Sequence, residues 1–287
     1  MKTAAIQMVS TPSLSVNLDS ALALLTRAAR EGAELAVLPE YFCLLGNRDT
    51  DKLGIQEVYG HGVIQQFLAD AARALNLWIV GGTLPLSIGQ AQVESGVQDG
   101  VSEAAPTPRV HNSSLVFSPA GACVARYDKM HLFRFDNGQE RYDESRVLQA
   151  GHQPVTFELP SRDGHVWRIG MSICYDLRFP ELYRGYARAG VDLLLVPSAF
   201  THTTGQAHWE VLLRARAIEN QAFVVAAAQG GLHENGRRTW GHSMLVDPWG
   251  TVAAQVPDGA DVVCEELLPA MLKQSRGRLP ALSHRVL

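Results

Sequence analysis

The chain is most informative at Val166-Trp-Arg-Ile-Gly-Met-Ser-Ile-Cys174, an apolar run that continues directly into Tyr175-Asp-Leu-Arg-Phe-Pro-Glu181. The run predicts a buried strand, and Pro180 fits the first position of a helix that follows a sharp turn. A thiol at this elbow would be exposed at the sheet edge, next to backbone N–H groups that can bind negative charge. A nucleophile needs this setting, although a lone cysteine is more often a buried structural residue.

Two further strand ends carry charged side chains. Glu40 follows the short apolar strand predicted at residues 35–38, and Lys129 follows the strand predicted at residues 123–127. Taken alone, the glutamate fits a solvated or ion-paired residue and the lysine fits a surface residue with a buried stem. Because sites in α/β sheets gather at the carboxyl ends of strands, we expect both to lie near Cys174. A carboxylate can act as general base for a thiol, and an ammonium group can stabilise an oxyanion.

The rest of the chain alternates strands and helices at first and then forms hairpins. Strands are expected near residues 3–9, 35–38, 77–82, 112–117, 123–127, 155–159, 166–173, 192–196, 222–228, 242–246, 251–256 and 261–265, and helices near 18–29, 64–75, after 180, 207–219 and 268–276. This mixture predicts an α/β sandwich of two mixed sheets with helices outside. Residues 84–110 are rich in Gly, Pro, Gln, Ser and Glu and are predicted to form a long mobile loop.

The order Glu40, Lys129, Cys174 resembles the nitrilase superfamily of carbon–nitrogen hydrolases. The resemblance covers nearly the whole chain, through Ala5-Ile-Gln-Met8, Leu38-Pro-Glu40, Tyr127-Asp-Lys129-Met-His-Leu132, Ile173-Cys-Tyr-Asp176 and Gly241-His-Ser-Met-Leu-Val-Asp-Pro-Trp-Gly250. It implies a four-layer αββα fold, one domain over residues 1–287, and a homodimer or higher homo-oligomer. Residues 279–287 are expected to pack across a partner subunit, with a frayed terminus as the alternative.

The same resemblance implies an amidase that works through a thioester on Cys174. Glu40 would be the general base, and Lys129 with the backbone N–H of Tyr175 would hold the oxyanion. Glu144 matches the second glutamate of the family and would orient Lys129 and the substrate nitrogen. A solvated loop charge is the other interpretation of Glu144.

The sequence gives less support to another nucleophile, a metal site or a phosphate-binding site. Cys43 lies three residues after Glu40 without a following turn and helix, so we expect it to pack beside the pocket. The segment at residues 241–245 lacks the last glycine of a serine elbow. His202 and His208 do not form an H-E-x-x-H pair, and no phosphate-binding glycine loop is present. We therefore expect neither a metal nor a cofactor.

The substrate is inferred from segments around the predicted pocket. Residues 176–181 and 197–221 resemble the branch that hydrolyses deaminated glutathione, an anionic α-keto acid amide, to 2-oxoglutarate and cysteinylglycine. The similar ω-amidase branch hydrolyses α-ketoglutaramate, and carbamoyl or aliphatic amides and a non-catalytic partner-binding role are further alternatives. The candidate substrate-binding residues are Tyr41, Arg178, Phe200, His202, Thr203 and Thr204. Arg178 is equally well interpreted as an ion-pair partner of Glu181.

Composition limits the class of protein. The 287 residues are 46% hydrophobic and 19% charged, which suffices for a large core, and the net charge of −4 gives no basic surface for nucleic acid. No apolar run approaches the roughly 18 residues that a membrane span needs, and the N-terminus does not resemble a signal peptide. The four cysteines are widely spaced, which is typical of a reduced cytoplasmic protein.

Overall fold

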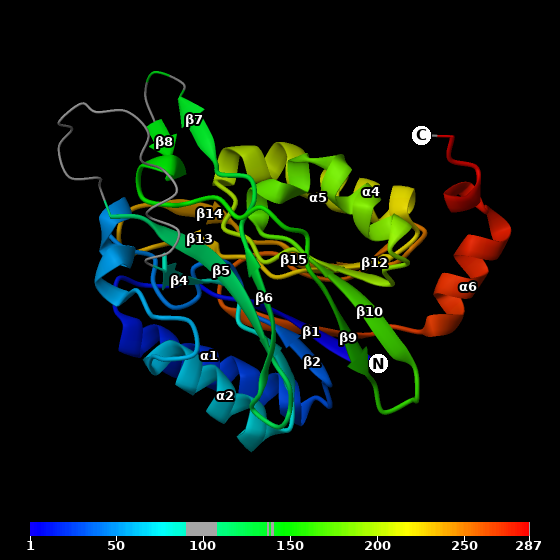
Figure 1. Cartoon of the computed structure of the whole chain (residues 1–287), viewed down its shortest axis with the longest axis horizontal. Helices are drawn as coiled ribbons and strands as arrows, with labels where there is room; N and C mark the ends of the chain where they lie inside the picture. Colours follow the sequence, from blue (N-terminus) through cyan, green and yellow to red (C-terminus); the bar gives the residue numbers. More distant parts are fainter. Residues whose placement is uncertain (90–107, 137, 139–140, 287) are drawn as a thin grey trace.

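The computed structural model describes residues 1–89, 108–136, 138 and 141–286. Two large sheets stack face to face, with a pair of helices on each outer face (Figure 1). The expected αββα sandwich of mixed sheets is confirmed. The first sheet contains β1 (Lys2–Gln7), β2 (Leu35–Val37), β3 (Trp78–Val80), β4 (Leu84–Ser87), β5 (Val110–Phe117), β6 (Cys123–Asp128) and β17 (Asp261–Glu266), in the order β17-β1-β2-β3-β5-β4, with β6 also paired to β5.

The second sheet has six strands. They are β9 (Thr156–Pro160), β10 (Val166–Met171), β11 (Leu193–Leu195), β12 (Phe223–Ala226), β15 (Ser243–Val246) and β16 (Val252–Val256), in the order β16-β15-β12-β11-β10-β9. Two small ribbons lie outside the sandwich and were not predicted from the sequence. They pair β7 (Arg134–Asp136) with β8 (Arg141–Asp143), and β13 (Gly230–Leu232) with β14 (Arg238–Trp240).

Helices cover the outer faces of both sheets. The first sheet carries α1 (Leu14–Arg30) and α2 (Val63–Leu75), and the second carries α4 (Pro180–Arg188) and α5 (His202–Asn220), with α6 (Pro269–Arg278) beside the sandwich (Figure 1). Short 3-10 helices are η1 (Asp49–Ile55), η3 (Glu144–Arg146), η4 (Cys174–Arg178) and η5 (Ala281–Ser283). Among the described residues, no helix is long and apolar enough to cross a membrane.

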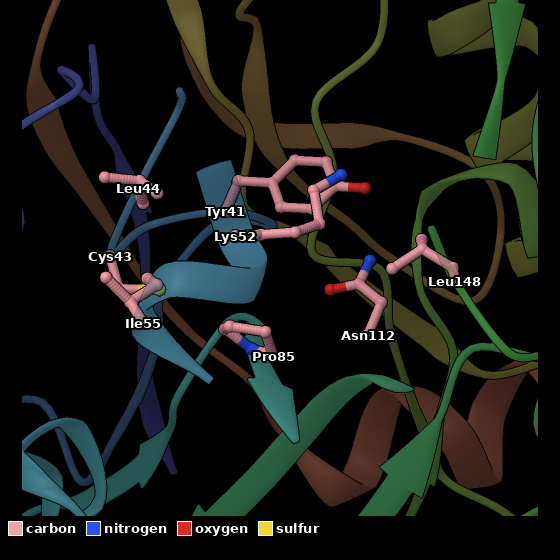
Figure 2. Close-up of a pocket in the computed structure, with 8 residues that line it drawn as sticks. All are labelled: Tyr41, Cys43, Leu44, Lys52, Ile55, Pro85, Asn112 and Leu148. Atoms are coloured by element: carbon pink, nitrogen blue, oxygen red, sulfur yellow. The ribbon is translucent and has the colours of Figure 1, made fainter. Parts of the chain in front are cut away.

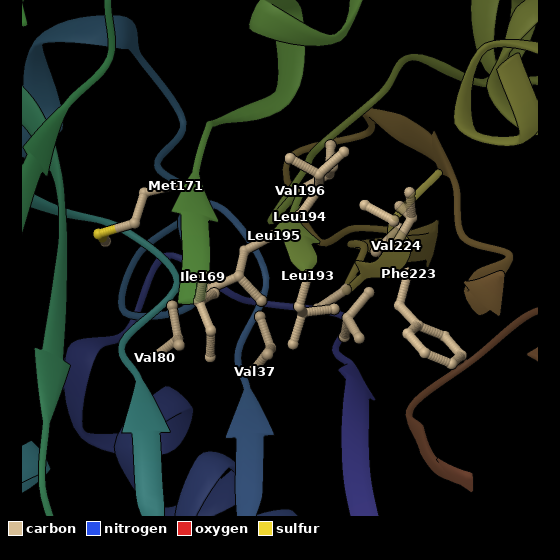
Figure 3. Packing of buried hydrophobic residues seen from close by; sticks show 14 of the residues in the cluster. Val37, Val80, Ile169, Met171, Leu193, Leu194, Leu195, Val196, Phe223 and Val224 are labelled. Atoms are coloured by element: carbon tan, nitrogen blue, oxygen red, sulfur yellow. The ribbon is translucent and has the colours of Figure 1, made fainter. Parts of the chain in front are cut away.

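The main core lies between the two sheets. Val37 and Val80 of the first sheet face Ile169 and Leu195 of the second (Figure 3), and all four side chains are fully buried. Central parallel strands are covered on both faces, which is why they form continuous apolar runs such as the three leucines of β11. Truncating one such side chain to alanine costs about 2–5 kcal/mol, so this core fixes the positions of the strand ends.

Strand directions bring the three predicted catalytic side chains to one edge. β1, β2 and β3 are parallel, and two antiparallel pairings, β3 with β5 and β5 with β6, return β6 to the direction of β3. In the other sheet β10, β11 and β12 are parallel. Figure 3 shows the strands that carry Val37, Val80 and Met171 pointing the same way. The segments after β2, β6 and β10 therefore leave the sandwich at one end.

Three local predictions were wrong. Residues 84–87 are not loop but the strand β4, whose Pro85 is tolerated at the sheet edge because an edge strand has a backbone side without a partner. The remaining part of that predicted loop falls largely outside the described residues.

α5 begins at His202, five residues before the predicted start, so residues 202–204 form its first turn.

The buried face of α1 is also rotated from its expected position. Leu22 is 41% exposed, whereas Asn17 is 1% exposed. The Asn17 amide donates to the carbonyls of Thr11 and Cys43, so a polar anchor determines which face turns inward.

Beyond α6, the side chains of Leu279 and Val286 are exposed. The packing of residues 279–287 against a partner subunit stays a prediction.

Candidate active site

Cys174 occupies a strained elbow between β10 and α4. Its φ of 47° is left-handed, a conformation that costs a non-glycine residue roughly 1–3 kcal/mol. Its N–H donates to the carbonyl of Pro197 at 2.9 Å, which fixes the elbow against the end of β11. The expectation of an exposed thiol was wrong, because Cys174 is only 9% exposed. The segment at residues 199–201 lines the same pocket beside it.

Lys129 lies between two carboxylates. Its Nζ donates to Glu40 Oε1 at 2.9 Å and to both Glu144 oxygens at 3.0 and 2.9 Å. Lys129 and Glu40 are fully buried, and Glu144 is nearly so. Three predicted residues from distant parts of the sequence therefore meet in one ion triad, and Glu144 is not a solvated loop charge. A buried ammonium is stable only when its donors are satisfied in this way.

Glu40 is held by backbone and side-chain donors on both oxygens. Asn112 donates to Oε1 at 2.9 Å and the N–H of Ala199 donates to Oε2 at 3.0 Å. The Cys174 thiol also hydrogen-bonds to this carboxylate. The Pro39–Glu40 turn approaches Gly82 so closely that a Cβ there would lie 2.0 Å from the Pro39 carbonyl oxygen, so residue 82 must be glycine.

The surroundings of the four ionisable groups of the site shift their pKa values in different directions from the ordinary values. Burial raises the pKa of Glu40, and the Glu144 charge adds to this, while Lys129 opposes it. Burial and the neighbouring Glu40 charge raise the pKa of Cys174 well above its usual value. Although burial opposes both shifts, the Lys129 ammonium lowers the pKa of Glu144, and the Glu144 and Glu40 carboxylates raise that of Lys129. A proton can therefore be exchanged between Cys174 and Glu40 while Glu144 and Lys129 stay charged.

Asp176 joins the cysteine elbow to the lysine segment, and its role was not predicted from the sequence. Its buried carboxylate accepts from the N–H of Ile173 at 2.8 Å, the Tyr127 hydroxyl at 2.7 Å and the N–H of His131 at 3.0 Å, and it lies 2.7 Å from His131 Nδ1. The His131 ring stacks on Phe179 at 3.7 Å. One carboxylate thus fixes the chain on both sides of the site. Its place two residues after Cys174 is the signal that could have identified it.

The thiol opens into a pocket of about 410 Å³. It is lined by Glu40, Tyr41, Lys129, Phe133, Glu144, Cys174, Tyr175, Arg178, Ala199, Phe200, Thr201, Thr204 and Arg237. Four of the six candidate substrate-binding residues are in this wall. The other two are not, because α5 begins earlier than expected: Thr203 is exposed, and His202 packs against the Trp240 ring at 5.1 Å. Phe133, Thr201 and Arg237 were missed.

Arg178 does not pair with Glu181 in the part of the chain that the structure describes. Its guanidinium lies 5.4 Å above the Phe200 ring and 5.8 Å above the Tyr175 ring, and its Nη1 is 3.3 Å from His208 Nδ1. The structure therefore favours the pocket interpretation of Arg178.

A smaller cavity of about 240 Å³ lies behind Tyr41 (Figure 2). The Tyr41 hydroxyl donates to Glu144 at 2.9 Å, and Lys52 Nζ lies 4.8 Å from the centre of the Tyr41 ring. Cys43 lines this cavity, as expected for a residue beside the pocket, and its thiol points to the Thr83 carbonyl at 3.5 Å. Burial raises the pKa of Cys43 to about 12, and the carbonyl that its thiol contacts cannot take up the thiol proton as a carboxylate can. No group of three metal-binding side chains occurs within the described ranges.

Comparison with known proteins gives this geometry a family. A family model described as carbon–nitrogen hydrolase matches residues 2–276. Two relatives described as deaminated glutathione amidase, from Synechocystis sp. and Homo sapiens, are 39% and 38% identical. The alignments cover 99% of this chain and 97% of the Synechocystis protein, and 97% and 80% for the human protein.

Solved structures agree. The C. elegans NitFhit protein is 35% identical with a TM-score of 0.83, covering 99% of this chain and 65% of that one. A Saccharomyces cerevisiae member of branch 10 of the nitrilase superfamily is 28% identical with a TM-score of 0.81, covering 98% and 94%. The chain therefore belongs to the carbon–nitrogen hydrolase family and hydrolyses non-peptide carbon–nitrogen bonds of linear amides.

Proposed function

We propose that this hydrolase cleaves deaminated glutathione through a thioester on Cys174. The observation that carries the proposal is the contact of a buried thiol with a carboxylate of raised pKa, beside a lysine held by a second carboxylate. The substrate is proposed because relatives that are 38–39% identical over nearly the whole of this chain carry that name.

The proposed reaction begins when Glu40 accepts the proton of the Cys174 thiol. The thiolate attacks the amide carbonyl carbon, and Lys129 and the backbone N–H of Tyr175 hold the oxyanion. The tetrahedral intermediate collapses, Glu40 returns the proton to the leaving nitrogen, and the amine departs. Glu40 then takes a proton from water, the hydroxide attacks the thioester carbonyl carbon and displaces the Cys174 thiolate, and Glu40 returns its proton to the sulfur, which restores the thiol. The net reaction consumes one amide and one water and yields one carboxylic acid and one amine.

The electrostatics of the site support these roles. A base that must return its proton works best with a pKa raised toward neutrality, and burial does this for Glu40. The pKa of Glu144 is lowered, so that carboxylate stays ionised and keeps the Lys129 charge in place. The N–H of Cys174 is already bound to Pro197, which supports Tyr175 rather than Cys174 as the backbone oxyanion donor.

An anionic substrate is supported by Arg178, whose guanidinium lines the pocket. Tyr175 and Phe200 hold it by ring contacts, and its Nη1 contacts His208, which leaves its other edge donors for a carboxylate. An α-keto acid amide carries such a group beyond the carbonyl that is attacked.

The test compares deaminated glutathione with α-ketoglutaramate as substrates for the wild type, Cys174→Ala and Cys43→Ala. We expect faster hydrolysis of deaminated glutathione, full loss with Cys174→Ala, and near wild-type rates with Cys43→Ala. Preference for α-ketoglutaramate would move the enzyme to ω-amidase activity with the same mechanism. Hydrolysis by Cys174→Ala would overturn the thioester.

We further propose a cytoplasmic homodimer built from one domain over residues 1–287. Its four free cysteines support a reducing compartment. The exposed apolar side chains of Val211, Ile218 and Trp249, near α5, support burial in a subunit contact together with residues 279–287. Removing residues 279–287 would then raise the monomer fraction measured by light scattering.

A further inference from the structure

Among the described residues, two arginines of the pocket, Arg178 and Arg237, have no carboxylate partner. Glu40 and Glu144, the carboxylates that line it, both bind Lys129. Within the described part of the chain, neither Arg178 nor Arg237 forms an ion pair. A half-buried guanidinium without a carboxylate is costly unless a ligand supplies one.

Arg237 is held in place by a turn that is itself anchored. It lies at the end of the tight turn between β13 and β14, and its N–H donates to Asn235 Oδ1 at 3.0 Å. The Asn235 amide in turn donates to the carbonyls of Gly46 at 2.7 Å and Leu45 at 3.3 Å. The left-handed Gly236, with φ of 80°, completes the turn.

The hairpin is also fixed to the start of α5. Thr239 bridges Thr201, and the N–H of Trp240 donates to the Phe200 carbonyl at 3.0 Å. The Arg237 guanidinium lies 5.2 Å from the centre of the Tyr142 ring. A guanidinium that rests on a ring keeps its edge N–H groups available for bidentate contact with a carboxylate, and it loses little freedom on binding.

The two arginines come from different segments of the pocket wall. Arg178 follows Cys174 on η4 and contacts Tyr175, the proposed oxyanion donor, so it lies with the acyl-binding elements. Arg237 contacts Tyr142, two residues before Glu144, which is proposed to face the substrate nitrogen. Two separated cations suit a substrate with an anionic group on each side of the bond that is cleaved.

We propose that Arg237 is a specificity-determining residue that binds a carboxylate on the leaving-amine part of the substrate. The inference rests on the proposed function and adds a second recognition point to it. Deaminated glutathione has one carboxylate on its 2-oxoglutaryl part and another on its terminal glycine. α-Ketoglutaramate has only the first. Arg237 thus selects amides whose leaving amine is itself anionic.

The experiment measures kcat and KM on three substrates: deaminated glutathione, the same compound with its glycine carboxylate converted to a primary amide, and α-ketoglutaramate. The variants are Arg237→Gln, Arg237→Lys and the control Arg238→Gln, which removes the same charge from the neighbouring, exposed residue of the hairpin. Arg237→Gln should raise KM for deaminated glutathione by about 10- to 100-fold, the value of one charge-assisted contact, with little change in kcat. Arg237→Lys should recover part of the loss.

The capped and single-carboxylate substrates separate recognition from structure. KM for both should be the same in Arg237→Gln and in the wild type, and Arg238→Gln should match the wild type on all three. An equal loss on every substrate would show that Arg237 only supports the hairpin, and no loss on any would show that it binds nothing; either result overturns the inference.

Failure of the proposed function would look different. If the wild type turned over none of the three compounds, the proposed substrate would be wrong. Calorimetry on Cys174→Ala would then decide the inference. The inference requires deaminated glutathione to bind more tightly than its capped form to Cys174→Ala, and equally to the double variant that also carries Arg237→Gln.

Discussion

The floor of the pocket and its hairpin wall are built in different ways. The floor consists of Glu40, Lys129 and Cys174, each at the end of a strand in the double sheet, each buried and each paired to another polar group. The wall is the β13–β14 ribbon, whose Arg237 is half-buried and touches an aromatic ring rather than a carboxylate. The charged groups of the floor pair with one another, whereas the Arg237 guanidinium of the wall can still bind an anionic ligand.

From this difference we expect the floor residues to carry out the reaction and the wall to determine which substrate binds. Reacting groups must be held to fractions of an ångström, and rigid strand ends with satisfied hydrogen bonds do this. A loop or hairpin on such a scaffold can change its side chains without moving the floor. Substitutions in the floor should therefore lower kcat, and substitutions in the wall should mainly raise KM.

The largest effect is expected from removing the proposed base. Glu40→Gln keeps the shape of the side chain and an oxygen that can accept from Lys129, but its amide nitrogen can accept neither the hydrogen bond from Ala199 nor a proton, so kcat should fall about 10³-fold. Initial rates at saturating substrate measure this, with the exposed Glu210→Gln on α5 as the control. Retention of more than a tenth of the wild-type kcat would show that another group takes the thiol proton.

Lys129→Gln tests whether the floor is also a stability element. It leaves two buried carboxylates without their cation, so unfolding free energy should fall by about 3–5 kcal/mol. Loss of an oxyanion donor should lower kcat about 10²-fold as well. Urea unfolding and rate measurements on the same preparation separate the two. An unchanged urea midpoint would mean that the triad does not hold the floor together.

The pH profile should distinguish the two carboxylates of the floor. Burial raises the pKa of Glu40 above its ordinary 4.5. As the pH falls, the Glu40–Cys174 pair, which already carries the thiol proton, therefore takes up a second proton at a pH at which carboxyl groups with an ordinary pKa are still ionised. Below that point kcat/KM should fall about tenfold per pH unit. The acid limb must therefore have its midpoint above 4.5, and a midpoint at or below 4.5 would contradict the raised pKa.

The stability contribution of Glu144 has the opposite sign. Its folded pKa is lowered, so its stabilisation is present above the unfolded value of 4.5 and is lost as pH falls through the folded value. Glu40, with a raised folded pKa, stabilises the fold only when protonated. Glu144→Gln should therefore cost stability at pH 7 and progressively less below pH 4.5, as calorimetric melting would show.

Asp176→Asn should have a smaller effect, because it moves the floor without removing a reacting group. The amide cannot accept from Ile173, Tyr127 and His131 together, so one donor loses its partner and unfolding free energy falls by about 1–3 kcal/mol. A small shift of Cys174 against Lys129 should lower kcat roughly tenfold and leave KM nearly unchanged. A change in KM alone would place Asp176 in substrate binding.

The sequence predicted the floor because strand ends leave a pattern. Predicted strands that end just before Glu40, Lys129 and Cys174 can be identified in the sequence, and the rule that sites collect at the carboxyl ends of strands places the three residues together. Burial of the thiol did not follow from that pattern, because residues 199–201, which line the same pocket, belong to another segment.

The wall was not predicted for a physical reason. The strand Gly230-Gly-Leu232 is too short and too rich in glycine to show an alternating pattern, and its composition is typical of a turn. His202 and Thr203 were expected in the pocket because their segment follows the strand predicted at residues 192–196, with the helix expected only from residue 207. The first turn of α5 has no strong helix-forming residues, so propensity gives no sign of its earlier start. Tertiary contacts with Trp240 outweigh that weak propensity.

The smallest effect concerns the anchor of the wall. Asn235→Ala removes the contacts to Leu45 and Gly46 and frees the turn that carries Arg237, without touching the floor. We expect KM for deaminated glutathione to rise about threefold, and unfolding free energy to fall by about 1 kcal/mol, the worth of a typical hydrogen bond. Glu234→Ala, an exposed neighbour in the same turn, is the matched control and should do neither. If Asn235→Ala lowered kcat as Glu40→Gln does, the wall would belong to the catalytic floor, and the division between chemistry and selection would fail.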